Sequence, residues 1–528
     1  MLAITLIVAA VSALMTQDRA VDRDDTVVDG TPVTVYTAGG QRPPGPVIVI
    51  AHGFAGSRQL MQAYAQLLAR YGYTALTFDF LGHGRHDRPL TGSIVDTQGA
   101  TQSLLRQLEE VVGHARRLPG AEQGIGLLGH SMAADILVRF TQPRDDAPGQ
   151  WQGSDLVAGM VGVSMFAPTI DETTPPNLLM IAGQFEGRLI EEARRVASLV
   201  AAEDSLIEPS VTVGDAEAGS LRRVKVAAGV EHVGVLYQRA ALQEAVVWFD
   251  QVFDREDQAS LQVPARGVAI LGLLAGLVLL AWPLSRWLPR DAARAAASRA
   301  APRCRSWRSF AVLVLTPAIL TPLLLWPIPT RFLPVLVADY LALHFAVYGA
   351  LTAVLLLLIR RRDRVASMRP AAALPTGARA LRLPVSGLVA TALVLVYGLA
   401  IIGHVIDTWL TAFFVTPVRL PLFLAILPGT LLYFLADERL TREVRPVPGA
   451  SLLSKVAFLA SLAFAVVLDF SGLFFLLIIV PVIVLFFAVY GLFSRWVFAR
   501  TGLPWVAGTA NAVVFAWALA VTFPLLGG

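Results

Sequence analysis

The chain has 528 residues, of which 55% are hydrophobic, and its mean hydropathy is +0.61. This is too apolar for a soluble protein of this size, so we expect part of the chain to lie in a membrane. The formal net charge of +4 gives little support to nucleic-acid binding, and a single cysteine, Cys304, excludes a disulfide framework. No Cys/His metal spacing, P-loop or dinucleotide fingerprint occurs, so neither a metal nor a cofactor is expected.

The first element is a short apolar run, Leu2–Met15, which lacks the basic residue usual ahead of a signal sequence. Residues 1–18 are therefore predicted to be either a cleaved signal peptide or a signal anchor, and the sequence does not choose between them.

A soluble-type α/β domain is predicted over residues 25–258. Four consecutive β-branched residues, Val47–Ile50, predict a strand buried in a parallel sheet, which runs into a loop containing His52, Gly53 and Phe54. A glycine-bearing loop at this place can present a backbone N–H, here that of Phe54, to a developing oxyanion. A second strand at 73–78 ends in a D-x-x-G-x-G turn, whose Asp79 is expected to brace the turn.

The run Gly129-His130-Ser131-Met132-Ala133 lies between a predicted strand and a predicted helix. This context is typical of a nucleophile elbow, a tight turn that exposes the serine hydroxyl above the sheet. The backbone N–H of Met132, just after the serine, would be the second oxyanion donor.

Two further strands place an acid and a base after Ser131. Glu186 follows the strand at 177–182, and His232 follows the strand at 224–228. A serine needs an imidazole to take its proton, and the imidazole needs a carboxylate to fix its tautomer. The order Ser…acid…His is that of one nucleophile-elbow fold.

On these motifs, residues 30–255 resemble the α/β-hydrolase fold in its serine-hydrolase branch. The pattern H-G-x…D-x-x-G-x-G…G-H-S-x-[GA] is most similar to the lysophospholipase, monoglyceride-lipase and proline-iminopeptidase-like group. The resemblance implies that Ser131 is the nucleophile, His232 the general base and acid, and Glu186 the orienting carboxylate, with Phe54 and Met132 as oxyanion donors.

Other residues of the pattern are expected to have supporting roles. His52, Gly53 and His130 would line the site. The sequence departs from the family pattern in two places: Ala133 replaces the last glycine of the elbow, and the acid is Glu rather than Asp. The second departure leaves Asp171 or Glu172 as alternative acids.

The predicted domain has no room for a helical lid, because only the short polar stretch at 169–176 separates two strands. An extra helix at 189–202 and a hairpin-like segment at 210–225 could lie beside the acid loop. The site is therefore expected to be open, or to be covered by the membrane or by another part of the chain.

From residue 265 to 528 we predict an all-α membrane domain of about eight spans, each near the 20 residues that cross a bilayer. The spans are 267–288, 310–328, 333–359, 384–406, 417–436, 452–469, 472–494 and 503–526.

Arginines gather after every second span, and positive charge is retained on the cytoplasmic side. The clusters are Arg286, Arg290, Arg294, Arg299, Arg303, Arg305 and Arg308 after the first span, Arg360, Arg361, Arg362, Arg364, Arg369, Arg379 and Arg382 after the third, Arg439, Arg442 and Arg445 after the fifth, and Arg495 and Arg500 after the seventh; the alternate connections hold little beyond Arg331 and Arg419. The hydrolase domain, which precedes the first span, is therefore predicted to be extracytoplasmic in a bacterial-type inner or cell membrane.

Several polar residues lie in or at the ends of the predicted spans: Asp339, His344, His404, Asp407 and Asp469. They either reach water at the interface or line a vestibule beneath the hydrolase site.

The sequence thus favours a membrane-embedded serine hydrolase that cleaves carboxylic esters of lipid-like or apolar acyl groups through an acyl-enzyme. Its partners would be the ester substrate and membrane lipids, with no nucleic acid. A peptidase or acyltransferase of the same fold, and a transporter or scaffold with an accessory hydrolase domain, are the alternatives.

Overall fold

The computed structural model describes residues 1–40, 43–92, 99–143, 156–202, 207–255, 261–290, 306–330, 332–366, 384–443 and 446–527. Several residues used for the topology prediction lie outside these ranges. They are Arg294, Arg299, Arg303, Arg305, Arg331, Arg369, Arg379, Arg382, Arg445 and Cys304, together with the predicted domain end at 258.

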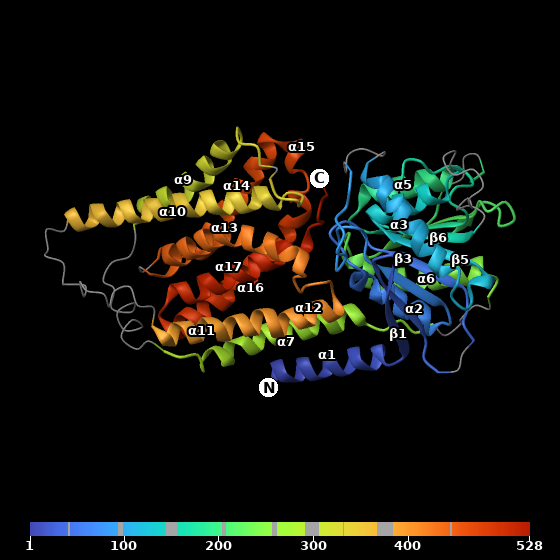
Figure 1. The fold of residues 1–528 in the computed structure, drawn as a ribbon, viewed down its shortest axis with the longest axis horizontal. Coiled ribbons are helices and arrows are strands. Elements are labelled where there is room, and N and C mark those ends of the chain that lie inside the picture. Colours follow the sequence, from blue (N-terminus) through green and yellow to red (C-terminus); the bar gives the residue numbers. More distant parts are fainter. Residues whose placement is uncertain are drawn as a thin grey trace. The chain divides into compact units, whose positions relative to one another are not determined.

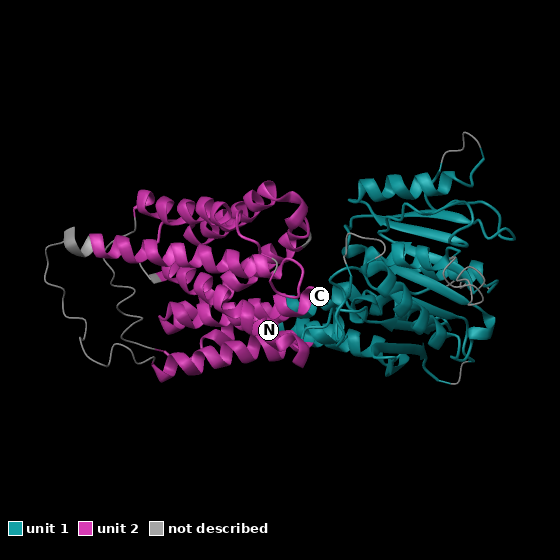
Figure 2. Cartoon of the chain, turned by 45° about the horizontal axis from the view of Figure 1, so that its top comes forward, with its two compact units in different colours: residues 1–275, 405–413, 524–528 teal, residues 276–404, 414–523 magenta. Residues whose placement is uncertain are grey.

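The chain forms two compact units (Figure 2). Unit 1 contains residues 1–275, and it also takes in two short segments from the far end of the chain, 405–413 and 524–528. Unit 2 contains residues 276–404 and 414–523. Membership of the two short segments in unit 1 does not follow from the sequence pattern.

Unit 1 is built on a nine-stranded sheet in the order β1-β2-β4-β3-β5-β6-β7-β9-β8. The six strands from β4 to β9 in this order run parallel, and β1, β2 and β8 pair antiparallel at the edges. Apolar runs such as V-I-V-I-A of β3 are buried over their full length, as expected of a parallel sheet covered on both faces. The strands are β1 Val21–Val28, β2 Thr31–Ala38, β3 Val47–Ala51, β4 Thr74–Phe78, β5 Ile125–His130, β6 Val157–Val163, β7 Leu178–Gly183, β8 Thr212–Val213 and β9 Arg222–Ala227.

Helices cover both faces of this sheet and form two apolar cores (Figure 1). On one face pack α3 Ala100–Ala115, α4 Met132–Thr141 and α5 Gly187–Ser198. On the other face pack α2 Gln62–Arg70 and α6 Arg239–Val252. Because the carboxyl ends of the parallel strands meet at one edge, the loops that leave β3, β5, β6, β7 and β9 converge there.

The hairpin of β1 and β2 is not among the strands predicted from the sequence. Strand β1 reads V-D-R-D-D-T-V-V and is exposed along its centre, so it lacks the apolar alternation that indicates a strand. It is held as a strand by its antiparallel pairing with β2, which runs from Val21 opposite Ala38 to Val28 opposite Thr31. The apolar run at the N-terminus forms a helix, α1 Leu2–Asp18.

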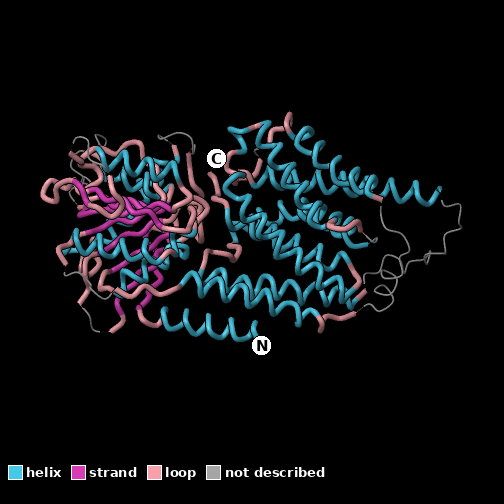
Figure 3. Tube along the Cα trace, turned by 180° about the vertical axis from the view of Figure 1, so that it is seen from behind, coloured by secondary structure: helices cyan, strands magenta, loops and turns pink. Residues whose placement is uncertain are grey.

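All described strands belong to unit 1, and the described secondary-structure elements of unit 2 are helices (Figure 3). Eight of the described helices are long and apolar enough to cross a membrane: Arg266–Ser285, Trp307–Leu325, Ala338–Arg362, Val385–Trp409, Pro417–Arg442, Ala450–Leu468, Ile479–Thr501 and Pro504–Thr522. The predicted fold class is confirmed: an α/β domain is followed by a series of apolar helices that could span a membrane.

Within that series the labelled helices are α7 Arg266–Ser285, α9 Trp307–Leu325, α10 Ala338–Ala366, α11 Val385–Leu395, α12 Gly403–Trp409, α13 Leu420–Glu438, α14 Ala450–Leu468, α15 Phe470–Leu473, α16 Leu476–Thr501 and α17 Pro504–Thr522. A π-helical stretch, Val396–Ile402, joins α11 to α12.

Most of the polar residues noted in the predicted spans of unit 2 have local partners. The Asp339 carboxylate accepts the N–H groups of Phe332 and Tyr340, and the ring of His344 lies between the hydroxyls of Tyr340 and Ser461 at 3.2 and 3.1 Å. Asp469 accepts the N–H of Gly472 at the start of α15. The buried Asp339 and His344 are thus satisfied by hydrogen bonds, and the exposed Asp469 caps α15, so none of the three residues needs a separate site.

Candidate active site

Ser131 lies at the sharp turn between β5 and α4. Its φ of 55° and ψ of −120° are a strained backbone conformation for a residue with a side chain. The turn is held by a hydrogen bond from the Ser131 N–H to the Val163 carbonyl, 2.8 Å. A side chain at Gly129 would be 2.7 Å from Leu137 and 2.9 Å from the Ala134 nitrogen, so the turn requires glycine there. Ala133 is fully buried in the core, so this elbow has room for a methyl group.

The structure brings Ser131, His232 and Glu186 together as a hydrogen-bonded chain. His232 Nδ1 lies 2.6 Å from Glu186 Oε1, and His232 Nε2 lies 2.9 Å from Ser131 Oγ. A carboxylate only accepts hydrogen bonds, so Nδ1 carries the imidazole proton. Nε2 of the neutral ring is then the acceptor for the serine hydroxyl, which is the arrangement that general-base catalysis needs.

The second oxygen of Glu186 is also fixed. Oε2 accepts the Ser164 hydroxyl and the Gly183 N–H, each at 2.6 Å. Burial acts to raise the pKa of Glu186, but the hydrogen bonds from His232, Ser164 and Gly183 outweigh it, and this pKa lies below its ordinary value. The carboxylate is therefore ionised wherever His232 is needed as a base.

Ser164 is a site residue that the sequence analysis missed. It directly follows β6 and has a φ of 50°, and its N–H bonds the Ile181 carbonyl. The sequence feature that indicates Ser164 is its position at the carboxyl end of a buried strand. Ser131 and Glu186 are predicted at the same edge of the sheet.

The alternative acids lie elsewhere. Oδ1 of Asp171 accepts the N–H groups of Thr173 and Thr174, which makes it the anchor of a turn. The backbone carbonyls of Asp171 and Glu172 accept hydrogen bonds from the buried guanidinium of Arg222. In this structure Glu186 is the carboxylate that contacts His232.

The loop after β3 approaches the nucleophile closely. A side chain at Gly53 would lie 3.1 Å from Ser131 Cβ and 2.9 Å from His130 Nδ1, so only glycine fits. Phe54 follows Gly53, and Met132 is the first residue of α4, where a first-turn N–H has no acceptor within the helix. The two predicted oxyanion donors thus come from the loop beside Ser131 and from the helix N-terminus after it.

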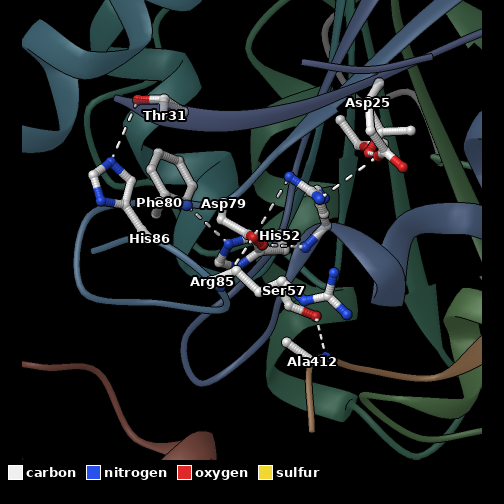
Figure 4. A network of polar contacts seen from close by, with 12 residues as sticks. Asp25, Thr31, His52, Ser57, Asp79, Phe80, Arg85, His86 and Ala412 are labelled. Carbon is white, nitrogen blue, oxygen red and sulfur yellow. Dashed lines mark hydrogen bonds and ion pairs between the residues drawn. The ribbon is translucent and has the colours of Figure 1, made fainter. Parts of the chain in front are cut away.

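His130 and His52 are buried supports. The His130 Nε2 lies 2.9 Å from the carbonyl oxygen of His232, and a carbonyl only accepts, so Nε2 carries the proton. His52 Nε2 accepts the Phe80 N–H (Figure 4), and its Nδ1 donates to the Gly53 carbonyl. Burial lowers the pKa of both rings, that of His130 to about 3, so they are neutral at ordinary pH.

The predicted bracing role of Asp79 matches its contacts. Its two carboxylate oxygens accept the backbone N–H groups of Arg58 and Arg85 at 2.8 and 3.1 Å. A side chain at Gly84, whose φ is +53°, would collide with this carboxylate. The described residues contain no group of three or more His, Cys, Asp or Glu placed to hold a metal ion.

Residues 42–212 match the family model described as serine aminopeptidase, S33. This range includes Ser131 and Glu186 and ends before His232. None of the curated proteins compared with the chain matches it significantly.

Several solved structures are similar to part of the chain. A CIB-like hydrolase from Thermoplasma acidophilum is 15% identical over 44% of this chain and 99% of its own, with a TM-score of 0.32. A dienelactone hydrolase from Anabaena variabilis is 15% identical over 44% of this chain and 98% of its own, with a TM-score of 0.31. A bacterial membrane phospholipase A is 13% identical over 47% of this chain and 92% of its own, with a TM-score of 0.28. The family match and the site geometry together support a serine-type hydrolase.

Proposed function

We propose that unit 1 is a serine hydrolase that cleaves carboxylic esters of apolar acyl groups through an acyl-enzyme. The observation that carries the proposal is the continuous hydrogen-bonded chain from Glu186 through His232 to Ser131 at the carboxyl edge of the sheet. The same site also has a strained turn at the nucleophile and a neighbouring loop position that admits only glycine. These three features together are typical of a catalytic site rather than of a surface cluster of polar residues.

The reaction follows from the protonation states of the three residues. As Ser131 Oγ attacks the ester carbonyl, His232 Nε2 takes its proton, and Glu186 stabilises the imidazolium that forms. The backbone N–H groups of Phe54 and Met132 would stabilise the tetrahedral oxyanion. His232 then returns the proton to the departing alkoxide, and the acyl group stays on Ser131. In the second half His232 takes a proton from a water molecule that attacks the acyl carbon, and it then gives that proton to Ser131 Oγ as the bond between Oγ and the acyl carbon breaks and the acid leaves.

An apolar acyl group is favoured by the surface around the triad. Phe185 immediately precedes Glu186, Val233 immediately follows His232, and Phe166 lies two residues beyond Ser164. Their side chains are 70%, 47% and 58% exposed. Apolar side chains held at the surface beside a site often contact an apolar ligand, which fits an acyl chain better than a charged one.

An aminopeptidase is the second candidate, and two observations favour it. The family match carries the description of a serine aminopeptidase. A hollow of about 640 Å³ beside α5 is lined by Glu191 and Glu192 among other residues, and a carboxylate could bind the free amino group of a peptide. Glu192 is already paired with Arg195 at 2.7 Å, so that role would fall on Glu191.

The proposed location is a bacterial-type cell membrane with the hydrolase unit outside the cytoplasm. It is supported by the eight apolar helices and by the arginines that follow alternate spans in the sequence. Membrane lipids and the ester substrate would be its partners, and the charge pattern does not indicate nucleic-acid binding.

Labelling with a fluorophosphonate probe tests the proposal directly. The full-length protein in detergent should become labelled, Ser131→Ala should not, and the exposed Ser210→Ala should label like the parent protein. An ester panel of increasing acyl length, run beside aminoacyl anilides, then separates the two candidates. Turnover of the anilides alone would favour the aminopeptidase, and no labelling at all would favour the transporter or scaffold alternative.

A further inference from the structure

The segment Val405–Phe413 packs within unit 1 against the loop that carries Phe54. Ser57, the last residue of this loop, is fully buried. Its hydroxyl accepts the Ala412 N–H at 3.0 Å (Figure 4). It also lies 3.0 Å from the Thr411 hydroxyl. The buried hydroxyl therefore has both hydrogen-bond partners in a segment more than 350 positions away in the sequence.

An ion pair adds a second attachment. The Asp407 carboxylate pairs with the guanidinium of Arg85 and also accepts the Phe413 N–H. The backbone N–H of Arg85 donates to Asp79, which accepts the Arg58 N–H through its other oxygen. Asp407 is thus connected through Arg85 and Asp79 to the residue that follows Ser57.

Two further contacts fix the same segment. The Gln62 amide donates to the Thr408 carbonyl, and the Trp409 indole donates to the Asp18 carboxylate. The segment is therefore attached along its length rather than at one point.

The loop between these attachments and the nucleophile is short. It runs from Gly53, which abuts Ser131, to Ser57, which contacts the segment. A hydrogen bond from the Gly56 N–H to the Gly53 carbonyl and a φ of 57° at Ala55 define its turn. His52 fixes one end through Phe80, and Arg58 fixes the other through Asp79. A shift at Ser57 would therefore move the Phe54 N–H.

We propose that Val405–Phe413 is a positioning segment for the oxyanion hole, acting through Ser57 and Arg85. This inference rests on the proposed serine-hydrolase function. Along the chain the segment includes the end of one apolar helix, Val385–Trp409, and precedes the next, Pro417–Arg442, so residues far in the sequence from the hydrolase motifs would set the rate of ester cleavage. A displacement of about 1 Å in a catalytic group can cost about 100-fold in rate, and loosening one attachment should cost about tenfold.

The test uses the full-length protein in detergent with two variants, Thr411→Val and Asp407→Asn. Thr411→Val removes the hydroxyl with little change in shape. Thr408→Val is the matched control, because the hydrogen bond from Gln62 reaches the backbone carbonyl of Thr408, which the substitution keeps. Expected results for the two variants are a kcat about tenfold lower, a KM within about twofold, and a matching loss of affinity for a trifluoromethyl ketone that forms the tetrahedral adduct.

Hydrogen exchange gives a readout that does not depend on activity. Peptides covering residues 52–61 should exchange faster in Thr411→Val and Asp407→Asn than in Thr408→Val. Faster exchange with unchanged kcat and inhibitor affinity would show a merely structural clamp and overturn the inference. Identical behaviour of all three variants would overturn it as well, while labelling at Ser131 left the proposed function standing. A parent protein that takes up no fluorophosphonate would instead refute the proposed function, and the positioning role with it.

Discussion

The Ser164 hydroxyl donates a 2.6 Å hydrogen bond to Glu186 Oε2, the oxygen that His232 does not use. Both carboxylate oxygens are therefore engaged, and the plane of the carboxylate is set by Ser164 and the Gly183 N–H together. Glu186 therefore orients the imidazole of His232 while Ser164 and Gly183 hold Glu186 in place.

Ser164→Ala should lower kcat about tenfold with little change in KM, because a hydrogen bond to a charged group contributes about 1.5–3 kcal/mol and one of three is lost. The Glu186 pKa should rise, since the Ser164 hydroxyl is one of the contacts that lower it. Steady-state kinetics on a short ester would measure the loss, with Ser210→Ala as control. A rate equal to that of the parent protein would show that Gly183 alone holds the carboxylate.

Glu186→Gln should reduce kcat by about 10⁴, because an amide cannot enforce the tautomer that leaves His232 Nε2 free to accept a proton. Asp171→Asn is the matched control and should keep activity within about twofold, since the hydrogen bonds of its carboxylate come from Thr173 and Thr174 rather than from His232. The reverse ranking of the two variants would assign the acid to Asp171.

The buried histidines should make the hydrolase unit sensitive to mild acid. Burial lowers the pKa of His52, of His86 to about 4 and of His130 to about 3. The unfolded chain, with ordinary histidine pKa values near about 6.5, therefore binds more protons than the folded one as pH falls. Stability should be full above about pH 6.5 and should decrease steadily toward pH 4.

Thermal unfolding of the detergent-solubilised protein between pH 7.5 and 4.5 would measure this effect. His86→Gln should make the pH dependence of Tm shallower, because one of the three buried titrating groups is gone. A Tm that is constant across this range would contradict neutral burial of the three rings.

The end of the chain should stabilise the D-x-x-G-x-G turn. Leu525 exchanges backbone hydrogen bonds with Gly82 and Leu90, at 2.8 Å each. Gly82 has a φ of +73°, and a side chain there would collide with the Leu525 carbonyl. Gly82→Ala should therefore destabilise unit 1 by about 1–3 kcal/mol, read as a lower Tm. Gly40→Ala, which has a similar φ but open space around it, separates the backbone cost from loss of the tail.

The topology can be tested with reporter fusions. Alkaline phosphatase joined at Gln262 should be active, and fusions at Ala297 and Ser367 should instead favour a cytoplasmic reporter, because the arginine-rich connections stay inside. The opposite pattern would invert the proposed orientation.

The sequence by itself determined the elements whose signals are local. A buried β-branched run such as Val47–Ile50, the small residues around Ser131 and a 20-residue apolar stretch each dictate their structure wherever they occur. The sequence also predicted that Ser131, Glu186 and His232 lie close together, since residues that follow parallel strands gather at one edge of the sheet.

Only the tertiary structure decided the contacts between residues far apart in the chain. Nothing beside Glu186 in the sequence distinguishes it from Asp171, and the choice depends on which loop reaches His232. Ser164 looks like any residue after a strand until its hydroxyl meets Glu186. Asp407 lies in the last turn of an apolar helix, and the sequence of a helix end is the same whether its carboxylate faces water or pairs with Arg85. Such partners are selected by packing and by the need to satisfy buried polar groups, neither of which is encoded within a short stretch of sequence.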